Sequence, residues 1–469
     1  MSTVTLPLWL VVLAGVLALI GLLDRLLVPS VRWFIRSRTN KVLDEVRSRL
    51  RIEIRPFQHT RRQALIDRLL YDDKVQQAAT ACMSEQNMPR ELVMARIQGY
   101  AREIVPAFNA YFYFRVGYWL GRKIAQTLYR VRVGYTDNEG LARVSPDATV
   151  VFVMNHRSNM DYILAAYLVA DQAALSYAVG EWARVWPLQQ LIRSMGAYFV
   201  RRNSRDELYR RVLERYIAMA TEAGVTQALY PEGSLSRDGK MKEPRLGALD
   251  YMIRGFNPEG ERDLVFVPLG INYDRTLEDR TQLLGLDENA AKPGRTRAAW
   301  NTLIFAAHQA GLSLRSEWHR FGYACVNFGT PVSMREYLLS RGFDFRKLDK
   351  EQRHARLAEF GTYLMDKVGR LIPVLPVPLM ALAFERNPDK ALSELEIKAE
   401  VELLIERLEA AGAHVYIPRR DRDYAITAGL RMMLLRHMVQ EKDGLYAANP
   451  AESTLLRYYA NSIAHLLPQ

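Results

Sequence analysis

Residues 149–161 read TVVFVMNHRSNMD, and the character of the chain changes within this stretch. Its first six residues are mostly apolar and β-prone, the loop after them is mostly polar, and a helical pattern begins at Tyr162. An apolar run that ends in a polar loop and leads into a helical pattern is typical of a strand–loop–helix unit. We therefore predict that this stretch opens an α/β domain.

Further apolar runs follow this unit, with helix-patterned stretches between them. The runs cover residues 197–200, 226–230, 264–271 and 323–328, and helical stretches cover 206–222 and 247–254. Strands that alternate with helices predict a mixed, mostly parallel sheet flanked by helices, with functional residues in the loops after the strands. We place this α/β domain at 131–345, between a helical N-terminal region at 41–130 and a helical C-terminal region at 346–469.

The first residues of the chain carry a membrane signal. Residues 6–23 contain no charge and are followed by basic residues such as Arg25 and Arg32. As a helix this run spans about 27 Å, close to the hydrocarbon thickness of about 30 Å. A cleaved signal peptide is the alternative, but its positive charge precedes the apolar run. We predict a transmembrane anchor within 1–40, an inner-membrane location and the α/β domain on the cytoplasmic side.

The composition limits the kinds of binding partner and cofactor that we expect. The net charge of +12 and pI near 9.5 favour polyanions, although solvated surface arginines explain the same charge. Only the charge favours nucleic acid, which we do not predict as a partner, whereas anionic membrane lipids are an expected one. Two distant cysteines indicate no disulfide framework, and HExxH, P-loop and dinucleotide motifs are missing, so we predict no metal and no cofactor.

The polar loop places a histidine and a carboxylate five positions apart, His156 and Asp161. At the junction of a strand and a helix, the carboxylate reaches one imidazole nitrogen and leaves the other facing a pocket. Such a histidine takes a proton from an alcohol that attacks a thioester, while the aspartate holds the tautomer. The chain has no G-x-S-x-G motif, so we expect direct transfer without a covalent serine intermediate.

Several blocks resemble the motifs of the glycerophospholipid acyltransferase superfamily, in the same order. They are NHRSNMD at 155–161, GAYFVRR at 196–202, YPEGSLSR at 230–237 and VPLG at 267–270. VNFGTP at 326–331 is similar to the strand that closes that domain, and LRYYANSIAHL at 456–466 is similar to a segment of the glycerol-3-phosphate and dihydroxyacetone-phosphate acyltransferases. The resemblance implies an acyltransferase fold. It also implies transfer of a fatty acyl chain from acyl-CoA or acyl carrier protein to the sn-1 hydroxyl of glycerol 3-phosphate, in phospholipid biosynthesis.

The site expected from these blocks has two catalytic residues, His156 and Asp161. Guanidinium groups match phosphate oxygens, so we assign the acceptor phosphate to the basic residues of the first two blocks. Glu232 accepts hydrogen bonds from acceptor hydroxyls or braces its loop, and Pro268 sets a tight turn near the acyl-donor site. The predicted substrate-binding residues are Arg157, Ser158, Arg201, Arg202, Glu232, Gly233, Ser236, Arg237 and Pro268.

One position departs from the resemblance. Members that bind an acceptor phosphate usually carry an arginine where this chain has Leu235. Either a nearby cation, such as Arg237 or Lys240, takes over, or the acceptor differs. Alternative acceptors are lysophosphatidate and dihydroxyacetone phosphate, and Pro231 before Glu232 resembles the lysophosphatidate branch. The alternative from another class is a non-catalytic membrane- or polyanion-binding protein on the same scaffold.

Overall fold

The computed structural model describes residues 56–109, 113, 117–169, 175–180, 188–201, 204–284 and 321–468. They all belong to one compact unit, Leu50–Gln469. The anchor predicted within 1–40 and the second-block residue Arg202 lie outside the described residues. Within the described ranges, every helix is too short or too polar to cross a membrane.

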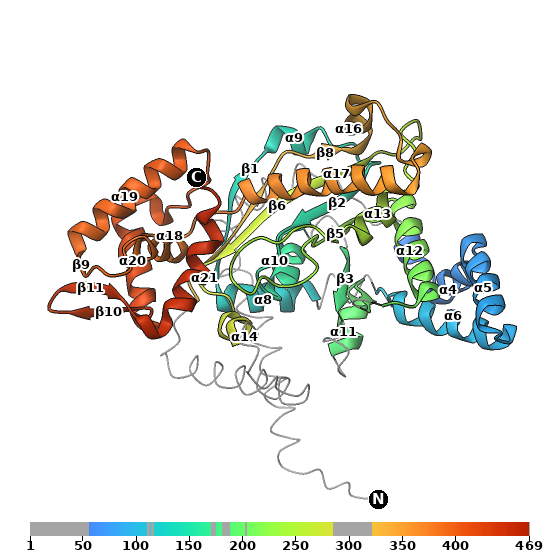
Figure 1. Ribbon diagram of the computed structural model, residues 1–469, viewed down its shortest axis with the longest axis horizontal. Helices are drawn as coiled ribbons and strands as arrows, with labels where there is room; N and C mark the ends of the chain where they lie inside the picture. The colour runs from blue at the N-terminus through green and yellow to red at the C-terminus, as the bar shows by residue number, and fades with distance from the viewer. Residues whose placement is uncertain are drawn as a thin grey trace, which may run out of the picture. The chain divides into compact units, whose positions relative to one another are not determined.

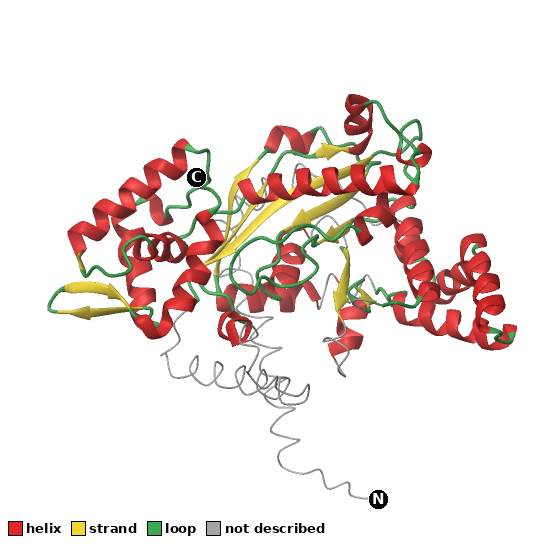
Figure 2. Cartoon of the chain, in the orientation of Figure 1, coloured by secondary structure: helices red, strands yellow, loops and turns green. Residues whose placement is uncertain are grey.

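A mixed sheet forms the core of this unit (Figures 1 and 2). Its strands are β1 (Arg130–Thr136), β2 (Thr149–Met154), β3 (Ser176–Gly180), β4 (Tyr198–Val200), β5 (Gln227–Leu229), β6 (Leu264–Tyr273), β7 (Tyr323–Phe328) and β8 (Val332–Ser333). Their order is β1-β7-β6-β2-β5-β3-β4, and β8 pairs with β6. Only the pairs that β6 forms with β7 and β8 are antiparallel among these described strands. The predicted mixed, mostly parallel sheet flanked by helices is therefore confirmed.

Strand β2 occupies the centre of the sheet. All six of its residues are buried, and it pairs in parallel with β6 on one side and β5 on the other. A strand covered on both faces has no polar side to present, which explains its continuous apolar run. The loop that leaves β2 thus starts from the buried centre of the sheet.

Helices cover the sheet. They are α8 (Tyr118–Leu128), α9 (Asn138–Ala142), α10 (Met160–Val169), α11 (Leu188–Ser194), α12 (Glu207–Glu222), α13 (Gly247–Ile253), α14 (Asp279–Leu284), α16 (Met334–Arg341) and α17 (Lys350–Arg370). Helix α17 lies along one face and packs on β6 and β2, where the rings of Phe360 and Phe266 are 5.3 Å apart (Figure 1). Residues 350–370, which we assigned to the C-terminal region, therefore share the core of the sheet.

The N-terminal helices pack beside α12. They are α3 (Pro56–His59), α4 (Arg62–Leu70), α5 (Asp73–Gln86) and α6 (Arg90–Ile104). Asp72 caps α5 by accepting from the amides of Lys74 and Val75, and its second carboxylate oxygen accepts from Arg215 Nε of α12 at 2.9 Å. One carboxylate therefore starts a helix and ties it to the next layer.

The C-terminal region contains more than the predicted helices. These are α18 (Pro376–Glu385), α19 (Glu394–Ala410), α20 (Arg422–Leu435) and α21 (Ser453–Ala464), with short 3-10 turns at 345–347, 418–420 and 450–452. A small antiparallel sheet accompanies them, formed by β9 (Leu392–Ser393), β10 (Val439–Lys442) and β11 (Leu445–Ala448). Asp443 and Gly444, both at positive φ, form the two-residue turn of its hairpin. An Asp-Gly pair is a common hairpin turn, and our helical assignment overlooked it.

Candidate active site

The predicted catalytic pair is assembled as the spacing indicated. Nδ1 of His156 lies 2.9 Å from Oδ2 of Asp161, and both side chains are buried. Asp161 stands in the first turn of α10, so its carboxylate also accepts from the loop amides of Arg157 at 2.7 Å and Ser158 at 3.0 Å. Nδ1 can only donate to this carboxylate, which leaves Nε2 as the atom that accepts a proton.

Two long-range contacts fix the ends of this loop. The side-chain amide of Asn155 exchanges two hydrogen bonds of 2.8 Å with the backbone of Ile271 in β6. The hydroxyl of Tyr273 donates to Oδ1 of Asp161 at 2.5 Å. The long strand β6 therefore orients both the start of the loop and the carboxylate that orients His156. Burial raises the pKa of Tyr273 well above its usual value, which keeps this donor protonated.

Tyrosine rings enclose the other side of His156. The centroid of the Tyr230 ring lies 4.5 Å from that of the imidazole. The centroid of the Tyr162 ring lies 5.3 Å from it, and these two rings meet edge to face. The hydroxyl of Tyr162 is 3.4 Å from Nε2, and its ring stacks on Tyr177 of β3. The proton-accepting nitrogen thus faces an aromatic wall with a hydroxyl at its edge.

Glu232 acts as a strut between two loops. Its carboxylate accepts from the backbone amide of His156 at 2.9 Å and from that of Lys242 at 3.1 Å, and its side chain is buried. Ser236 completes the link, because its amide donates to the carbonyl of His156 at 3.0 Å. Burial raises the pKa of Glu232, while Arg157 and the two amide donors oppose that shift. Of the two roles open for Glu232, these contacts describe the bracing one.

The first two predicted phosphate-binding arginines have internal partners. Arg157 is buried, and its guanidinium donates to the backbone carbonyl of Gly239 and, at 3.4 Å, to that of Ser462. Arg201 extends both prongs of its guanidinium to Glu103 of α6, at 2.9 and 2.6 Å. Its hydrogen bonds to the Glu103 carboxylate raise the pKa of Arg201 further. These contacts hold the second block against the N-terminal helices.

Lys242 contacts the backbone of Leu235, the position at which the resemblance would place an arginine. Its ammonium donates to Oγ of Ser234 at 2.9 Å and to the carbonyl of Leu235 at 2.7 Å. Both acceptors are neutral, and among the described residues no ion pair holds this lysine. Burial lowers the pKa of Lys242, and the carboxylate of Glu232 opposes this shift. Lys242 lines a groove of about 1470 Å³ together with Lys240 and Arg370.

Two stretches of the chain match family models. Residues 135–272 match the Acyltransferase family, and residues 312–468 match the family described as the glycerol-3-phosphate acyltransferase C-terminal region. The chain contains an acyltransferase domain. This domain holds His156, Asp161 and Glu232.

Curated relatives carry the name glycerol-3-phosphate acyltransferase. The protein from Pseudomonas entomophila is 28% identical over 86% of this chain and 49% of its own length. The protein from Xanthomonas axonopodis pv. citri is 24% identical over 86% of this chain and 46% of its own length. The chain therefore spans about half the length of these relatives. Among solved structures, the 1-acyl-sn-glycerophosphate (LPA) acyltransferase PlsC from Thermotoga maritima shares 15% identity over 66% of this chain and 97% of that chain, with a TM-score of 0.30.

Pro268 of the acyltransferase domain does not form the tight turn that we predicted. It lies inside β6, opposite Val153 of β2 in the register. Its carbonyl accepts from the amide of Gly329 at 2.9 Å. The N–H and C=O of a strand residue point to the same neighbour, so the missing N–H faces the turn between β7 and β8. A proline fits there because no ladder hydrogen bond is lost.

The remaining residues of the third block serve its loop. Gly233 has a φ of +68°, and a Cβ there would lie 2.6 Å from Cδ of Arg245. Ser236 is buried and donates to the carbonyl of Lys240 at 2.7 Å, whereas Arg237 is exposed. For these residues and for Ser158, a direct contact with substrate stays a prediction.

Sequence reasoning missed Glu278. Its carboxylate accepts from Oγ of Ser158 at 2.7 Å and from the amide and side chain of Asn159 at 3.2 and 3.0 Å. Burial raises the pKa of Glu278, and these donors oppose the shift. A lone glutamate after a strand has no sequence signal, so only the fold reveals that it holds the catalytic loop.

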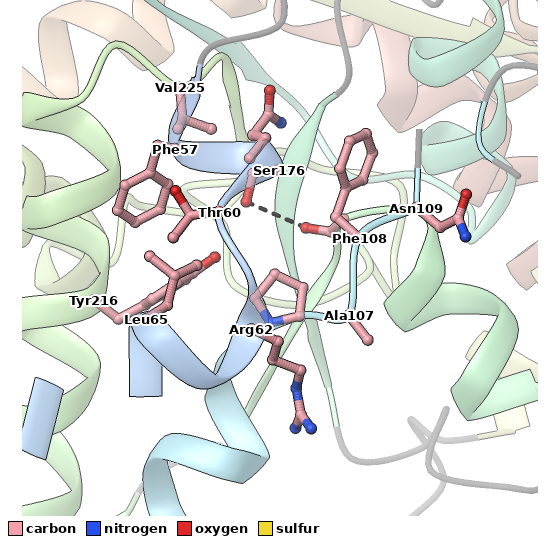
Figure 3. A pocket seen from close by; sticks show the side chains of 13 residues that line it. Phe57, Thr60, Arg62, Leu65, Ala107, Phe108, Asn109, Ser176, Tyr216 and Val225 are labelled. Carbon is pink, nitrogen blue, oxygen red and sulfur yellow. Dashed lines mark hydrogen bonds between the residues drawn. The ribbon is translucent and has the colours of Figure 1, made fainter. Parts of the chain in front are cut away.

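A separate cavity of about 220 Å³ lies between the N-terminal helices and β3 (Figure 3). Phe57, Leu65, Phe108 and Tyr216 surround it, and Oγ of Ser176 donates across it to the carbonyl of Gly196 at 3.3 Å. None of the predicted site residues that the structure describes lines this cavity. It is therefore not part of the catalytic site.

Within the described ranges, no cluster of three metal-ligating side chains occurs, and the predicted independence from metals and cofactors stays a prediction.

Proposed function

We propose that this protein transfers a fatty acyl chain from acyl-CoA or acyl carrier protein to the sn-1 hydroxyl of glycerol 3-phosphate. The observation that carries the proposal is the His156–Asp161 pair at 2.9 Å, inside a domain that matches the Acyltransferase family. The match of 312–468 to the glycerol-3-phosphate acyltransferase C-terminal region supports this acceptor.

The reaction follows from the orientation of His156. Nε2 removes the proton of the acceptor hydroxyl as its oxygen attacks the thioester carbonyl. Asp161 holds Nδ1–H and stabilises the imidazolium that forms. When the tetrahedral intermediate collapses, the C–S bond breaks and the imidazolium protonates the leaving thiolate. The products are an acyl ester and a free thiol, and His156 returns to its neutral form.

Lys242 supplies the cation that binds the acceptor phosphate in this proposal. Arg157 is buried with two backbone carbonyls as partners, and Arg201 is paired with Glu103. Lys242 is half-buried instead, lines a groove and donates only to two neutral oxygens. A phosphate is a stronger acceptor for an ammonium than a carbonyl or a hydroxyl, because the attraction between opposite charges adds to the hydrogen bond. Lys242 therefore takes over from the arginine that Leu235 replaces.

The test is thiol release from palmitoyl-CoA by the membrane fraction, with each acceptor offered separately. Release with glycerol 3-phosphate is the expected result. Release only with lysophosphatidate or dihydroxyacetone phosphate would reassign the acceptor. Failure with every acceptor, and also with acyl carrier protein as donor, would favour the binding-only alternative.

The proposal includes an inner-membrane location with the catalytic domain on the cytoplasmic side. The charge-free run at 6–23 and the basic residues after it support this location, and the basic surface favours anionic lipids. Extraction of membranes with alkaline carbonate tests it. An anchored protein stays in the pellet, and a protein held by charge alone is released.

A further inference from the structure

The C-terminal helix α21 contacts the loops of the active site through one short stretch, residues 458–462. The hydroxyl of Tyr459 accepts from the amide of Thr276 at 3.1 Å and donates to Oδ2 of Asp279 at 2.5 Å. Both partners belong to the segment that follows β6. This stretch of α21 lies within residues 456–466, the segment that resembles the glycerol-3-phosphate and dihydroxyacetone-phosphate acyltransferases. The proposed reaction assigns no role to it.

A second residue of the C-terminal region closes this contact into a triangle. Arg436, at the end of α20, donates to Oδ2 of Asp279 at 2.6 Å and to the hydroxyl of Tyr459 at 2.8 Å. Arg436, Asp279 and Tyr459 are all buried. Burial opposes the charge of Arg436, but Tyr459 and Asp279 outweigh it and raise its pKa. A buried ion pair with each partner engaged fixes geometry strongly, since losing one partner leaves an unpaired charge.

The segment held by this triangle also holds the catalytic loop. Glu278, adjacent to Asp279, accepts three hydrogen bonds from Ser158 and Asn159. Those two residues lie between His156 and Asp161 in the sequence. The C-terminal region thus reaches the catalytic pair through two successive connections, from Tyr459 and Arg436 to Asp279, and from Glu278 to the loop.

A parallel set of contacts joins α21 to the third-block loop. The carbonyl of Ser462 accepts from Arg157, and Nδ2 of Asn461 donates to the carbonyl of Asp238 at 2.9 Å. Gly239 has a φ of +84°, and a Cβ there would lie 1.9 Å from the carbonyl oxygen of Tyr458. The helix and the loop therefore touch backbone to backbone, which only a glycine permits.

We infer that the C-terminal region is part of the catalytic machinery, with Arg436 and Tyr459 as positioning residues that hold the catalytic loop through Asp279 and Glu278. The inference rests on the proposed function for its kinetic readout. It assigns a role to the segment at 456–466: this segment keeps the carboxylate of Asp161 in hydrogen-bond contact with Nδ1 of His156. Neither Arg436 nor Tyr459 needs to touch a substrate.

The sharpest variant is Tyr459→Phe, because it removes a single hydroxyl. We expect kcat to fall about 10- to 100-fold, since small displacements of a reacting group have effects of that order. The KM values for acceptor and donor should change less than threefold or so, because the substrate-binding loops keep their own contacts. Tyr446→Phe is the matched control: the same change in the same region, at a hydroxyl without a hydrogen bond to a described residue. It should retain the wild-type kcat.

Hydrogen–deuterium exchange separates positioning from activity. In the full-length protein, Tyr459→Phe should speed the exchange of amides in peptides covering 157–161, where Asn159 donates to Glu278, while Tyr446→Phe should not. Unchanged exchange in Tyr459→Phe would overturn the inference, and so would faster exchange with an unchanged kcat. If the wild-type protein transfers no acyl chain to any acceptor, the proposed function fails, and the exchange data still decide whether the C-terminal region holds the loop.

Discussion

Oδ2 of Asp161 lies 2.9 Å from Nδ1 of His156 and also accepts hydrogen bonds from two backbone amides of the loop between them, those of Arg157 and Ser158. The carboxylate therefore organises the loop and the base at once. A neutral amide at this position would supply no counter-charge for the imidazolium.

Asp161→Asn should lower kcat by about three to four orders of magnitude, because the imidazole loses its tautomer control and the imidazolium its counter-charge. The fold should persist, since Tyr273 and the strand contacts of Asn155 remain. The measurement is thiol release under saturating substrates, with circular dichroism as the check on folding. A variant that keeps a tenth of the wild-type rate would exclude this role.

Glu232→Gln tests the strut. A glutamine side chain has one acceptor oxygen, so one of the amides of His156 and Lys242 must lose its partner. We expect the free energy of unfolding to fall by about 1–3 kcal/mol. Chemical denaturation measures this change. Unchanged stability together with a raised KM for the acceptor would instead mean that Glu232 binds acceptor hydroxyls.

Lys242→Met should raise the KM for glycerol 3-phosphate about 10- to 100-fold and leave the KM for palmitoyl-CoA unchanged, since one charge-assisted contact with the phosphate is lost. Lys240→Met is the control, because Lys240 lines the same groove but is exposed.

The decisive variant adds Leu235→Arg to Lys242→Met. It returns a cation to the same loop and should recover most of the affinity for glycerol 3-phosphate. Equal effects of Lys240→Met and Lys242→Met would show that both lysines attract the substrate through the overall positive potential of the groove, without a direct contact between Lys242 and the phosphate.

The buried carboxylate of Asp274 predicts a pH dependence of stability. Burial raises its pKa to about 6, although the amides of Val377 and Tyr323 oppose that shift. The folded protein therefore keeps a proton that the unfolded chain loses near pH 4, so this group's contribution falls as pH rises from 4 to 6.

Two pKa units correspond to about 3 kcal/mol. In urea unfolding between pH 4 and 7, the wild-type protein should lose about that much more stability than Asp274→Asn, in which the titrating group is missing. Parallel curves for the two proteins would contradict this assignment.

The sequence predicted those parts of the fold whose signal is local. The continuous apolar run of β2 and the polar loop after it predicted this strand and the catalytic pair, although its place at the centre of the sheet was not predicted. Strand β1 escaped notice because its residues, RVRVGYT, alternate with charges on a half-exposed edge strand. The hairpin of β10 and β11 was missed because two short strands within a helical region have little periodicity.

The site was less predictable because its supports come from distant segments. Tyr273 is 112 residues from Asp161, and Glu278 is 120 residues from Ser158. No local spacing signals such partners. The arginines of the first two blocks illustrate the converse: their charge suggested phosphate, but Arg201 meets Glu103 of a helix 98 residues earlier. Residue type indicated the chemistry, and only the tertiary contacts show which groups already have partners.

The most direct test of the central claim is thiol release from palmitoyl-CoA with glycerol 3-phosphate, compared between wild-type protein and His156→Ala. His354→Ala, an exposed histidine of α17, serves as the matched control. General-base catalysis by His156 predicts a loss of about two to four orders of magnitude in His156→Ala and none in His354→Ala. Near-normal turnover in a folded His156→Ala protein would contradict the account.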